Sequence, residues 1–332
     1  EIVEGVKGRL RTLFGTANEM TLPLSATGSA GMEACFVNLL EPGDTAVVGV
    51  AGVFGERMCE VAHRAGAAVV RVETEWGTPL PEAEMIEAIG DAAPRVVAFV
   101  HAETSTGVCQ PVEAIAAAAN EAGAHVVLDC VTSIGGLPLA LDAWGVDAAY
   151  AGTQKCLSCP PGLSPASFSA RAVERVQARH TPVQSWYLDL GLLAGYYESG
   201  GGRVYHHTAP ISAIYALAEG LRIVEAEGMA AREKRHREAS AHLLEGLARL
   251  GFEPLVAEGY RLPQLNTVRL PASLVEAGEA GLRKRLLDLY GIEVGGGLGS
   301  LAGTIWRIGL MGENARIGAV DRLLEALRDE LA

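Results

Sequence analysis

Short, uninterrupted apolar segments alternate with longer segments of helical apolar spacing through the first two-thirds of the chain. Continuous runs of valine, leucine and alanine are typical of strands that are covered on both faces. Strands of this kind separated by helices predict an α/β fold with a mostly parallel sheet, whose ligands bind beyond the carboxyl ends of the strands. The predicted strands are residues 21–25, 45–50, 68–72, 95–101, 124–129, 148–151 and 166–169, and the predicted helices between them are residues 31–40, 55–65, 81–89 and 112–121.

The pattern changes after residue 210. A long helical segment is predicted from residue 211 to residue 250, with an interruption at Glu227-Gly-Met. Strands are predicted again at 266–270, 291–294 and 305–308, and they are followed by a terminal helix from Ala315. We therefore expect two domains, a large α/β domain at residues 1–227 and a smaller α+β domain at residues 228–332.

The composition narrows the choice of partners and compartment. The formal net charge is −13, whereas binding to nucleic acid or to an anionic membrane requires clustered lysine and arginine. No apolar segment approaches the ~20 residues of a membrane span, so we expect neither a nucleic acid nor a membrane as partner. Six scattered cysteines do not resemble a disulfide framework in a chain of this size, which fits the reducing cytoplasm. The chain begins at Glu1, inside a predicted amphipathic helix, and we expect the natural N-terminus to lie further upstream.

Two residues in particular indicate chemistry. Lys155 is one of four lysines, and it differs from the others in having no charged neighbour in sequence. A lysine held away from water has a lowered pKa and can act as a nucleophile that forms a Schiff base. Asp129 ends an apolar run 26 residues upstream, where a parallel strand would present it to a site. An acid at a strand end together with a solitary lysine on a later loop is the arrangement that pyridoxal phosphate needs.

Two further motifs leave alternatives open. Small hydroxyl and glycine residues at 27–33 follow the first strand and open a helix, which suits either a phosphate or a tight turn. Arg307 interrupts an apolar strand and needs an anionic partner there, either a substrate carboxylate or a structural ion pair. Residues 297–302 match a loose dinucleotide-binding pattern, but a strand follows where that motif requires a helix, so we reject it.

No metal site is expected. Cys156-Leu-Ser-Cys159 is a single CxxC motif without the further ligands that zinc needs, and we expect the two cysteines to fill a loop. His206 and His207 are adjacent, so their side chains point in different directions in an extended chain. This arrangement favours helix capping or hydrogen bonding over metal binding.

With these motifs in order, nearly all of the chain resembles the class V aminotransferases, which are pyridoxal-phosphate enzymes of fold type I. Within that class it is similar to the alanine–glyoxylate and serine–glyoxylate (serine–pyruvate) aminotransferases. The similarity combines several motifs in the family's order, which makes it specific although each motif alone is weak. The matching segments are residues 28–33, 41–44, 103–107, 128–133, 152–155, 205–208, 296–299 and 307–309.

The resemblance implies a role for each candidate site residue. Lys155 would form the internal aldimine, Asp129 would pair with the pyridinium nitrogen, and Arg307 would bind the substrate carboxylate. Phe54 stands where the family usually stacks a tryptophan on the ring. The remaining cofactor-binding residues would be Thr27, Gly28, Ser29 and Gln154 around the phosphate, Thr104 beside the phenolic oxygen, and Tyr205 and Thr208 reaching the phosphate of the neighbouring subunit.

The resemblance also implies a homodimer with shared active sites, because Tyr205 and Thr208 would serve the neighbour. The family's further N-terminal arm, which wraps the partner, has no counterpart in this sequence, so no residue is assigned to it. The implied activity is ping-pong transamination from alanine or serine to glyoxylate or pyruvate, small amino acids and 2-oxo acids being the substrates.

Alternative activities remain on the same scaffold. These are (S)-ureidoglycine–glyoxylate and 2-aminoethylphosphonate–pyruvate transamination, although residues 205–210 look more like the alanine and serine type. Cysteine desulfurases carry histidine directly before the lysine, where this chain has Gln154. A cofactor-free α/β binding protein is the alternative outside enzymes.

Overall fold

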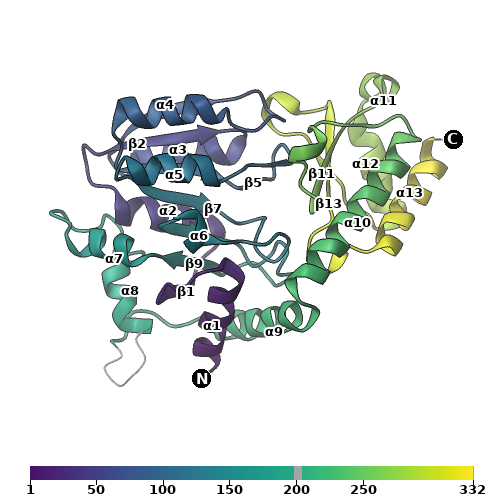
Figure 1. Cartoon of the computed structure of the whole chain (residues 1–332). Helices are drawn as coiled ribbons and strands as arrows, with labels where there is room; N and C mark the ends of the chain where they lie inside the picture. The colour runs from purple at the N-terminus through teal and green to yellow at the C-terminus, as the bar shows by residue number, and fades with distance from the viewer. Residues whose placement is uncertain (198–203, 332) are drawn as a thin grey trace.

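A seven-stranded sheet with helices on both faces forms the body of the computed structural model, which describes residues 1–197 and 204–331 (Figure 1). The strand order is β1-β9-β8-β7-β4-β2-β3. Within this sheet β9 runs in the direction opposite to that of the other strands. The strands are β1 Met20–Leu24, β2 Thr45–Val50, β3 Ala68–Glu73, β4 Val96–Val100, β7 His125–Asp129, β8 Ala148–Tyr150 and β9 Ser164–Phe168. The expected mostly parallel α/β fold is therefore confirmed.

Two apolar clusters, one on each face, explain the continuous apolar runs. Along β4, Val97 and Phe99 lie in one cluster, whereas Val96, Ala98 and Val100 lie in the other. The first cluster is covered by α1 Ile2–Phe14, α4 Glu82–Ala92, α5 Glu113–Glu121 and α9 Ile211–Glu227, and the second by α2 Gly28–Leu39, α3 Val53–Arg64, α7 Ala170–Gln177 and α8 Leu190–Tyr197. Both faces of each central strand are thus removed from water, which is why no polar alternation appears in the sequence.

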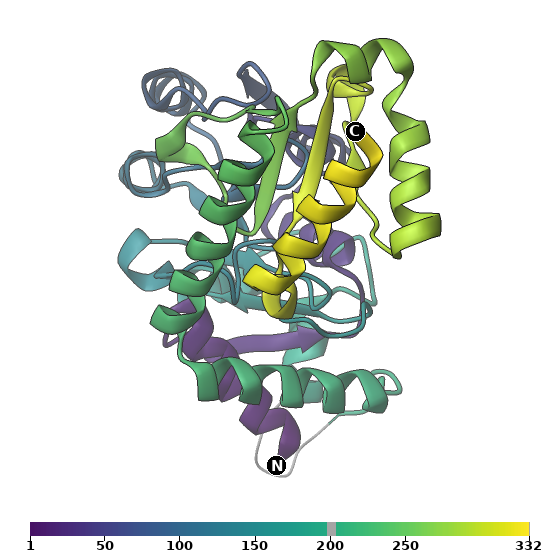
Figure 2. The same cartoon turned by 90° about the vertical axis from the view of Figure 1, so that its right-hand side faces the viewer.

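A second, antiparallel sheet follows the break at Gly228, where the backbone φ of 80° ends α9 and α10 begins. Its order is β10-β11-β13-β12, and helices α10, α12 and α13 pack on its side away from the large sheet (Figures 1 and 2). The elements are α10 Met229–Ala248, β10 Glu253–Pro254, β11 Leu265–Arg269, α11 Ala272–Ala277, α12 Glu279–Tyr290, β12 Gly295–Gly296, β13 Ile305–Gly309 and α13 Ile317–Leu331. The division into domains at 227 and 228 stays a prediction.

One predicted strand is wrong. Residues 291–294 are not extended into a strand, because α12 runs to Tyr290 and Gly291 ends it with a φ of 65° in the left-handed region. The strand lies just beyond, at Gly295–Gly296 of β12, where it pairs with Arg307 and Trp306 of β13. Glycine adopts a positive φ without steric strain, so Gly291 ends the helix, although the sequence predicted it as the first residue of a strand.

Several short elements were not predicted from the sequence. They are the hairpin of β5 Ala102–Glu103 with β6 Val108–Cys109, the short helix α6 Leu141–Trp144, helices α7, α8, α11 and α12, and the 3-10 turns η1 Glu258–Tyr260, η2 Gly299–Leu301 and η3 Gly312–Asn314. Among the described residues, no helix combines the length and the apolar character needed to cross a membrane.

Candidate active site

A buried carboxylate lies at the carboxyl end of the large sheet. Asp129 is the last residue of β7 and stands in register with Tyr150, the last residue of the parallel strand β8. The Tyr150 hydroxyl donates to Asp129 Oδ2 at 2.7 Å, and the Val131 N–H donates to Asp129 Oδ1 at 2.8 Å. Burial raises the pKa of Asp129 to about 7, although these two donors and nearby Lys155 act in the opposite direction. The site therefore favours a cation beside Asp129.

The loop after β8 brings Lys155 near this carboxylate. Lys155 is half-buried, and burial together with the positive charge of Arg307 lowers its pKa, while Asp129 raises it. The loop is held by a hydrogen bond from the Thr153 hydroxyl to the Pro160 carbonyl at 2.7 Å. Lys155 is thus an amine whose pKa lies below that of an exposed lysine.

The start of α2 approaches the same strand ends. A Cβ atom on Gly28 would lie 3.2 Å from Val131 Cγ2 and 3.3 Å from the Ala151 carbonyl oxygen, so glycine permits this close approach. Thr27 is the residue before the helix, and its exposed side chain makes no capping hydrogen bond. The first backbone N–H groups of a helix lack partners within it and attract anions. Thr27, Gly28 and exposed Ser29 lie at such a helix start.

Phe54 lies near the start of α3, and the β5–β6 hairpin positions it. The Val53 N–H donates to Ser105 Oγ at 3.0 Å, and the Ser105 hydroxyl donates to Glu103 Oε1 at 2.6 Å. A Cβ on Gly52 would collide with both Ser105 and Glu103, so this glycine is required by space. The Arg57 guanidinium carbon lies 4.9 Å from the centre of the half-buried Phe54 ring.

Sequence reasoning missed a role for Glu103, although it included the residue in a family motif. Burial raises its pKa, and its Oε2 has no hydrogen-bond partner among the described residues. Its charge influences the pKa values of both Asp129 and Arg307. The available signal was an acid two residues beyond a predicted apolar strand, similar to the position of Asp129 at the end of its own strand.

Arg307 reaches the site from the second sheet. Its Nε donates to the Gly296 carbonyl at 2.8 Å and its Nη1 donates to the Thr104 carbonyl at 3.2 Å. Within residues 1–197 and 204–331 no carboxylate lies within ion-pair distance of this guanidinium, and burial lowers its pKa. A half-buried arginine that donates to neutral carbonyls alone favours an anion supplied by a ligand. Thr104 itself is buried beside it.

Tyr205 and Thr208 contact one another at the surface of the chain. The Tyr205 side chain is 75% exposed, and its hydroxyl lies 3.2 Å from Thr208 Oγ1, while Gln154 is also exposed. The adjacent histidines form hydrogen bonds: His206 Nδ1 lies 2.8 Å from His207 Nδ1, and His207 Nε2 lies 2.7 Å from Ser25 Oγ. In the part of the chain that the structure describes, no group of three or more side chains could hold a metal ion.

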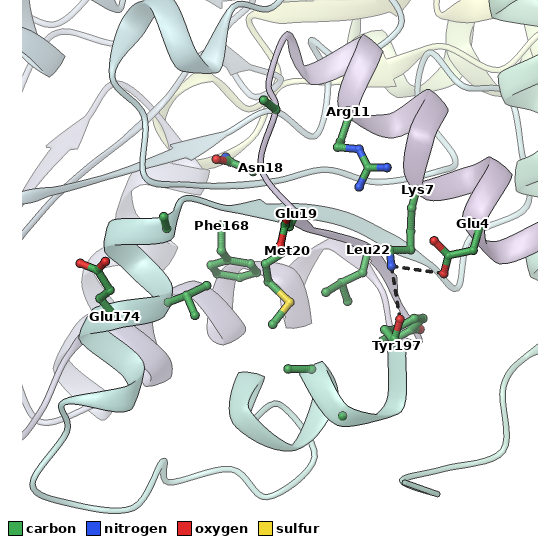
Figure 3. A pocket seen from close by; sticks show the side chains of 15 residues that line it. Glu4, Lys7, Arg11, Asn18, Glu19, Met20, Leu22, Phe168, Glu174 and Tyr197 are labelled. Atoms are coloured by element: carbon green, nitrogen blue, oxygen red, sulfur yellow. Dashed lines mark hydrogen bonds and ion pairs between the residues drawn. The ribbon is translucent and has the colours of Figure 1, made fainter. Parts of the chain in front are cut away.

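A cavity of about 1100 Å³ lies elsewhere, between α1, β1, α7 and α8 (Figure 3). Inside it, Lys7 Nζ donates to the Tyr197 carbonyl at 3.2 Å and pairs with Glu4 at 3.3 Å. None of the predicted site residues lines this cavity. It borders the edge strand β1 instead of the carboxyl ends of β7 and β8, so we do not assign the chemistry to it.

Known proteins are similar to this chain in sequence and in fold. A family model described as "Aminotransferase class-V" matches residues 1–315. The alanine–glyoxylate aminotransferase of Callithrix jacchus is 37% identical over 333 residues, which cover 100% of this chain and 80% of that protein. The (S)-ureidoglycine–glyoxylate transaminase of Bacillus subtilis (strain 168) is 37% identical over 325 residues, which cover 92% of this chain and 77% of that protein. Among solved structures, the alanine–glyoxylate aminotransferase of Nostoc sp. has a TM-score of 0.96 at 46% identity, with coverage of 100% of this chain and 86% of that chain.

The raised pKa of Asp129 predicts a pH-dependent cost to folding. In protein from which any small molecule has been removed, Asp129→Asn should become more stable than the wild type as pH rises. Ionisation of Asp129 penalises the native state, because its native pKa of about 7 exceeds the ordinary value of 3.8. The penalty is absent below the ordinary pKa, grows between the two values and is complete above about 7, where it is on the order of 4 kcal/mol.

Urea unfolding of both proteins between pH 4 and pH 8 measures this difference. Asp91→Asn, which removes a carboxylate from the exposed face of α4, is the matched control for the change of side chain itself. A difference between wild type and Asp129→Asn that stays constant over this pH range would contradict the assignment of the shift to Asp129.

Proposed function

Because the chain belongs to the class V aminotransferases, we propose that it transfers the amino group of alanine or serine to glyoxylate or pyruvate. Membership of this class makes it a pyridoxal-phosphate-dependent aminotransferase of fold type I. The relatives named as alanine–glyoxylate aminotransferases support the choice of donor and acceptor. The observation that carries the proposal is the approach of a half-buried Lys155 to the buried Asp129, with Arg307 beside it.

The described residues fit the cofactor. Pyridoxal phosphate requires an amine for its aldehyde, an acid for its ring nitrogen and a site for its phosphate. We assign these to Lys155, to Asp129 and to the start of α2 at Gly28, where an added Cβ would fill the space beside Val131. The other proposed contacts are Thr27 and Ser29 with Gln154 at the phosphate, Phe54 against the ring and Thr104 beside the phenolic oxygen. When bound, the cofactor supplies an electron sink for the substrate's Cα.

The chain's own residues move and hold the protons. Burial and Arg307 favour the neutral form of Lys155, so its Nζ can take the proton from the substrate's Cα and return it. Asp129 has a pKa near neutrality, and an adjacent cation would favour its ionised form. Tyr150 and Val131 hold both of its oxygens, so the carboxylate is oriented before a cation arrives.

Lys155→Ala is the test of this function. The variant should stay folded by far-ultraviolet circular dichroism, yet lose the visible absorption of bound cofactor. Transamination between alanine and glyoxylate should fall by roughly 10²–10⁴-fold or more, because both the attachment point and the base are removed. Lys234→Ala, at an exposed position of α10, is the matched control.

A panel of donors, assayed with both acceptors, decides the substrate class. Alanine or serine should be preferred to (S)-ureidoglycine and to 2-aminoethylphosphonate. Turnover by Lys155→Ala at the wild-type rate would contradict the proposed mechanism. Preference for another donor would contradict only the proposed substrate and would be compatible with the mechanism.

Arg307 is the proposed site for the substrate carboxylate. Two of its nitrogens donate to the Gly296 and Thr104 carbonyls, while Nη2 has no hydrogen-bond partner among the described residues. The free part of the guanidinium fork matches a planar carboxylate in geometry and in charge. The carbonyl contacts fix the guanidinium plane before substrate binds.

Arg307→Lys should therefore lower kcat/KM for alanine strongly. Lysine keeps the charge but cannot offer two parallel N–H groups, and the expected loss is on the order of 2–4 kcal/mol, or roughly 30- to 1000-fold. The affinity for the cofactor should stay nearly unchanged. Equal loss of cofactor and activity, or normal turnover of the corresponding amine without the carboxylate, would make Arg307 structural.

A homodimer with shared sites completes the proposal. Residues 204–215 expose large side chains, with Tyr205 75% exposed and Ile211 and Tyr215 also on the surface, and Trp186, 62% exposed, stacks on His206. Apolar surface of this kind marks protein interfaces. Because residues 205–208 match the family motif and Tyr205 is exposed, we propose that Tyr205 and Thr208 bind the phosphate of the neighbouring subunit.

Tyr205→Phe tests the shared site. The wild type should sediment at twice the mass of the chain, and the variant should keep that mass while losing cofactor faster on dilution, since a phosphate contact is removed. Tyr260→Phe, on the surface of η1, is the control. A fully active monomer would contradict the proposal.

We also propose a cytoplasmic location. All six cysteines are unpaired, and all except Cys109 are buried. Free buried thiols are compatible with a reducing compartment, where disulfides do not persist.

A further inference from the structure

One buried cation has no part in the function proposed above. Arg232 lies in the first turn of α10 and is only 1% exposed. A guanidinium in such a place costs free energy unless every donor finds an acceptor of good geometry. Its partners therefore show which segments the residue holds together.

Arg232 bridges the loops that carry the two central residues of the site. Its Nη2 donates to the Cys156 carbonyl at 2.7 Å, and Cys156 directly follows Lys155. Its Nε donates to the Gly135 carbonyl at 2.8 Å, in the loop that begins at Asp129. The two loops also touch one another, because a Cβ on Gly136 would lie 2.8 Å from Cys156 Sγ.

The same side chain binds the segment that follows the Arg307 strand. Arg232 Nη1 lies 2.5 Å from Glu227 Oε2, at the end of α9, and 3.1 Å from Glu313 Oε1, in η3. The Glu313 N–H in turn donates to Ser158 Oγ at 3.0 Å. A Cβ on neighbouring Gly312 would lie 2.6 Å from the Cys156 carbonyl oxygen, so η3 rests directly on the Lys155 loop.

We propose that Arg232 is a positioning residue that holds the Lys155 loop in place relative to Asp129 and to the strand of Arg307. It touches neither substrate nor cofactor, and it acts through the Cys156 and Gly135 carbonyls. Without it, these carbonyls lose their donors and the Lys155 loop is free to shift. Displacements on the order of 1 Å cost up to about 10²-fold in rate when reacting groups must be aligned. This inference rests on the proposed role of Lys155.

Arg235 is a matched control within the same helix. It makes a paired contact with Glu227, at 2.6 Å from Nε and 2.9 Å from Nη2, and its Nη1 donates to the Gly312 and Ala315 carbonyls at 2.8 Å. It thus shares the carboxylate and the η3 segment with Arg232, but among the described residues it makes no hydrogen bond to the Lys155 loop or to the Asp129 loop. Loss of Arg235 tests the stability of the junction without disturbing the site.

The experiment compares Arg232→Gln, Arg232→Lys and Arg235→Gln in the full chain purified with its cofactor. We expect Arg232→Gln to lower kcat for alanine and glyoxylate by about 10-fold or more, with KM within about threefold, because the fault lies in alignment and not in binding. The pH at which the visible absorption of bound cofactor changes should shift as well. Amide hydrogen exchange should become faster in peptides covering residues 131–137 and 152–160. Arg235→Gln should match the loss of thermal stability while kcat stays within about twofold.

Arg232→Lys guards against a variant that fails to fold. Lysine keeps the charge against Glu227 and Glu313, but its single nitrogen cannot occupy the three positions from which Nε, Nη1 and Nη2 reach their separate partners. We therefore expect an intermediate kcat and faster exchange at 152–160. Normal kcat, absorption and exchange in both Arg232 variants would overturn the inference, as would an equal loss of kcat in Arg235→Gln. Absence of transamination by the wild type would instead contradict the proposed function, and the exchange measurement would still report on Arg232.

Discussion

The hydrogen bond from Tyr150 to Asp129 joins the ends of two parallel strands, and the site is arranged around the carboxylate that it holds. Parallel pairing brings these two residues into register, so a buried acid and its donor are set by the sheet itself. Burial makes the charged form costly, and one tyrosine hydroxyl with one backbone N–H offsets this only in part. A cation close to the carboxylate removes the remaining cost. The folded sheet therefore bears the free-energy cost of ionising a buried carboxylate, and binding of a cation reduces that cost.

Charges of both signs are balanced across two sheets. Asp129 and Glu103 are buried acids at the ends of β7 and β5, and burial raises the pKa of each carboxyl group. Lys155 and Arg307 are half-buried cations from the large and the small sheet, and Arg307 favours the neutral form of Lys155. An anion bound at Arg307 would weaken that influence, which makes the proton affinity of Lys155 responsive to the presence of substrate. The second sheet thus influences the proton affinity of the proposed base.

The parallel fold could be predicted from the sequence because it depends on local pattern, and the proposal of Asp129 and Lys155 as site residues rests on the same kind of signal. Continuous apolar runs indicate strands with two covered faces, and Asp129 and Lys155 stand out by their position in such a pattern. Contacts between distant segments leave no comparable trace. The hydrogen bond between Val53 and Ser105 spans 52 positions in the sequence, and the one between Arg232 and Cys156 spans 76 positions. No local sequence pattern at any of these residues indicates its partner. Helix α8 is apolar almost throughout and so has no helical periodicity to detect, and Gly291 reads equally well as a strand residue or a helix end.

Ser25 joins two parts of the molecule that have been treated separately. Its hydroxyl bonds to His207 and its carbonyl accepts a hydrogen bond from Tyr187, while Thr27, two residues on, directly precedes α2. The exposed aromatic segment and the proposed phosphate site thus share one short stretch of backbone. Thermodynamic reciprocity requires that any free energy by which subunit association orders this stretch also appears in cofactor affinity, and in the same amount. Cofactor binding and association of the proposed dimer then share a single coupling free energy. The affinity for the cofactor would rise with the concentration of the chain, and the association constant of the dimer would rise with the concentration of the cofactor.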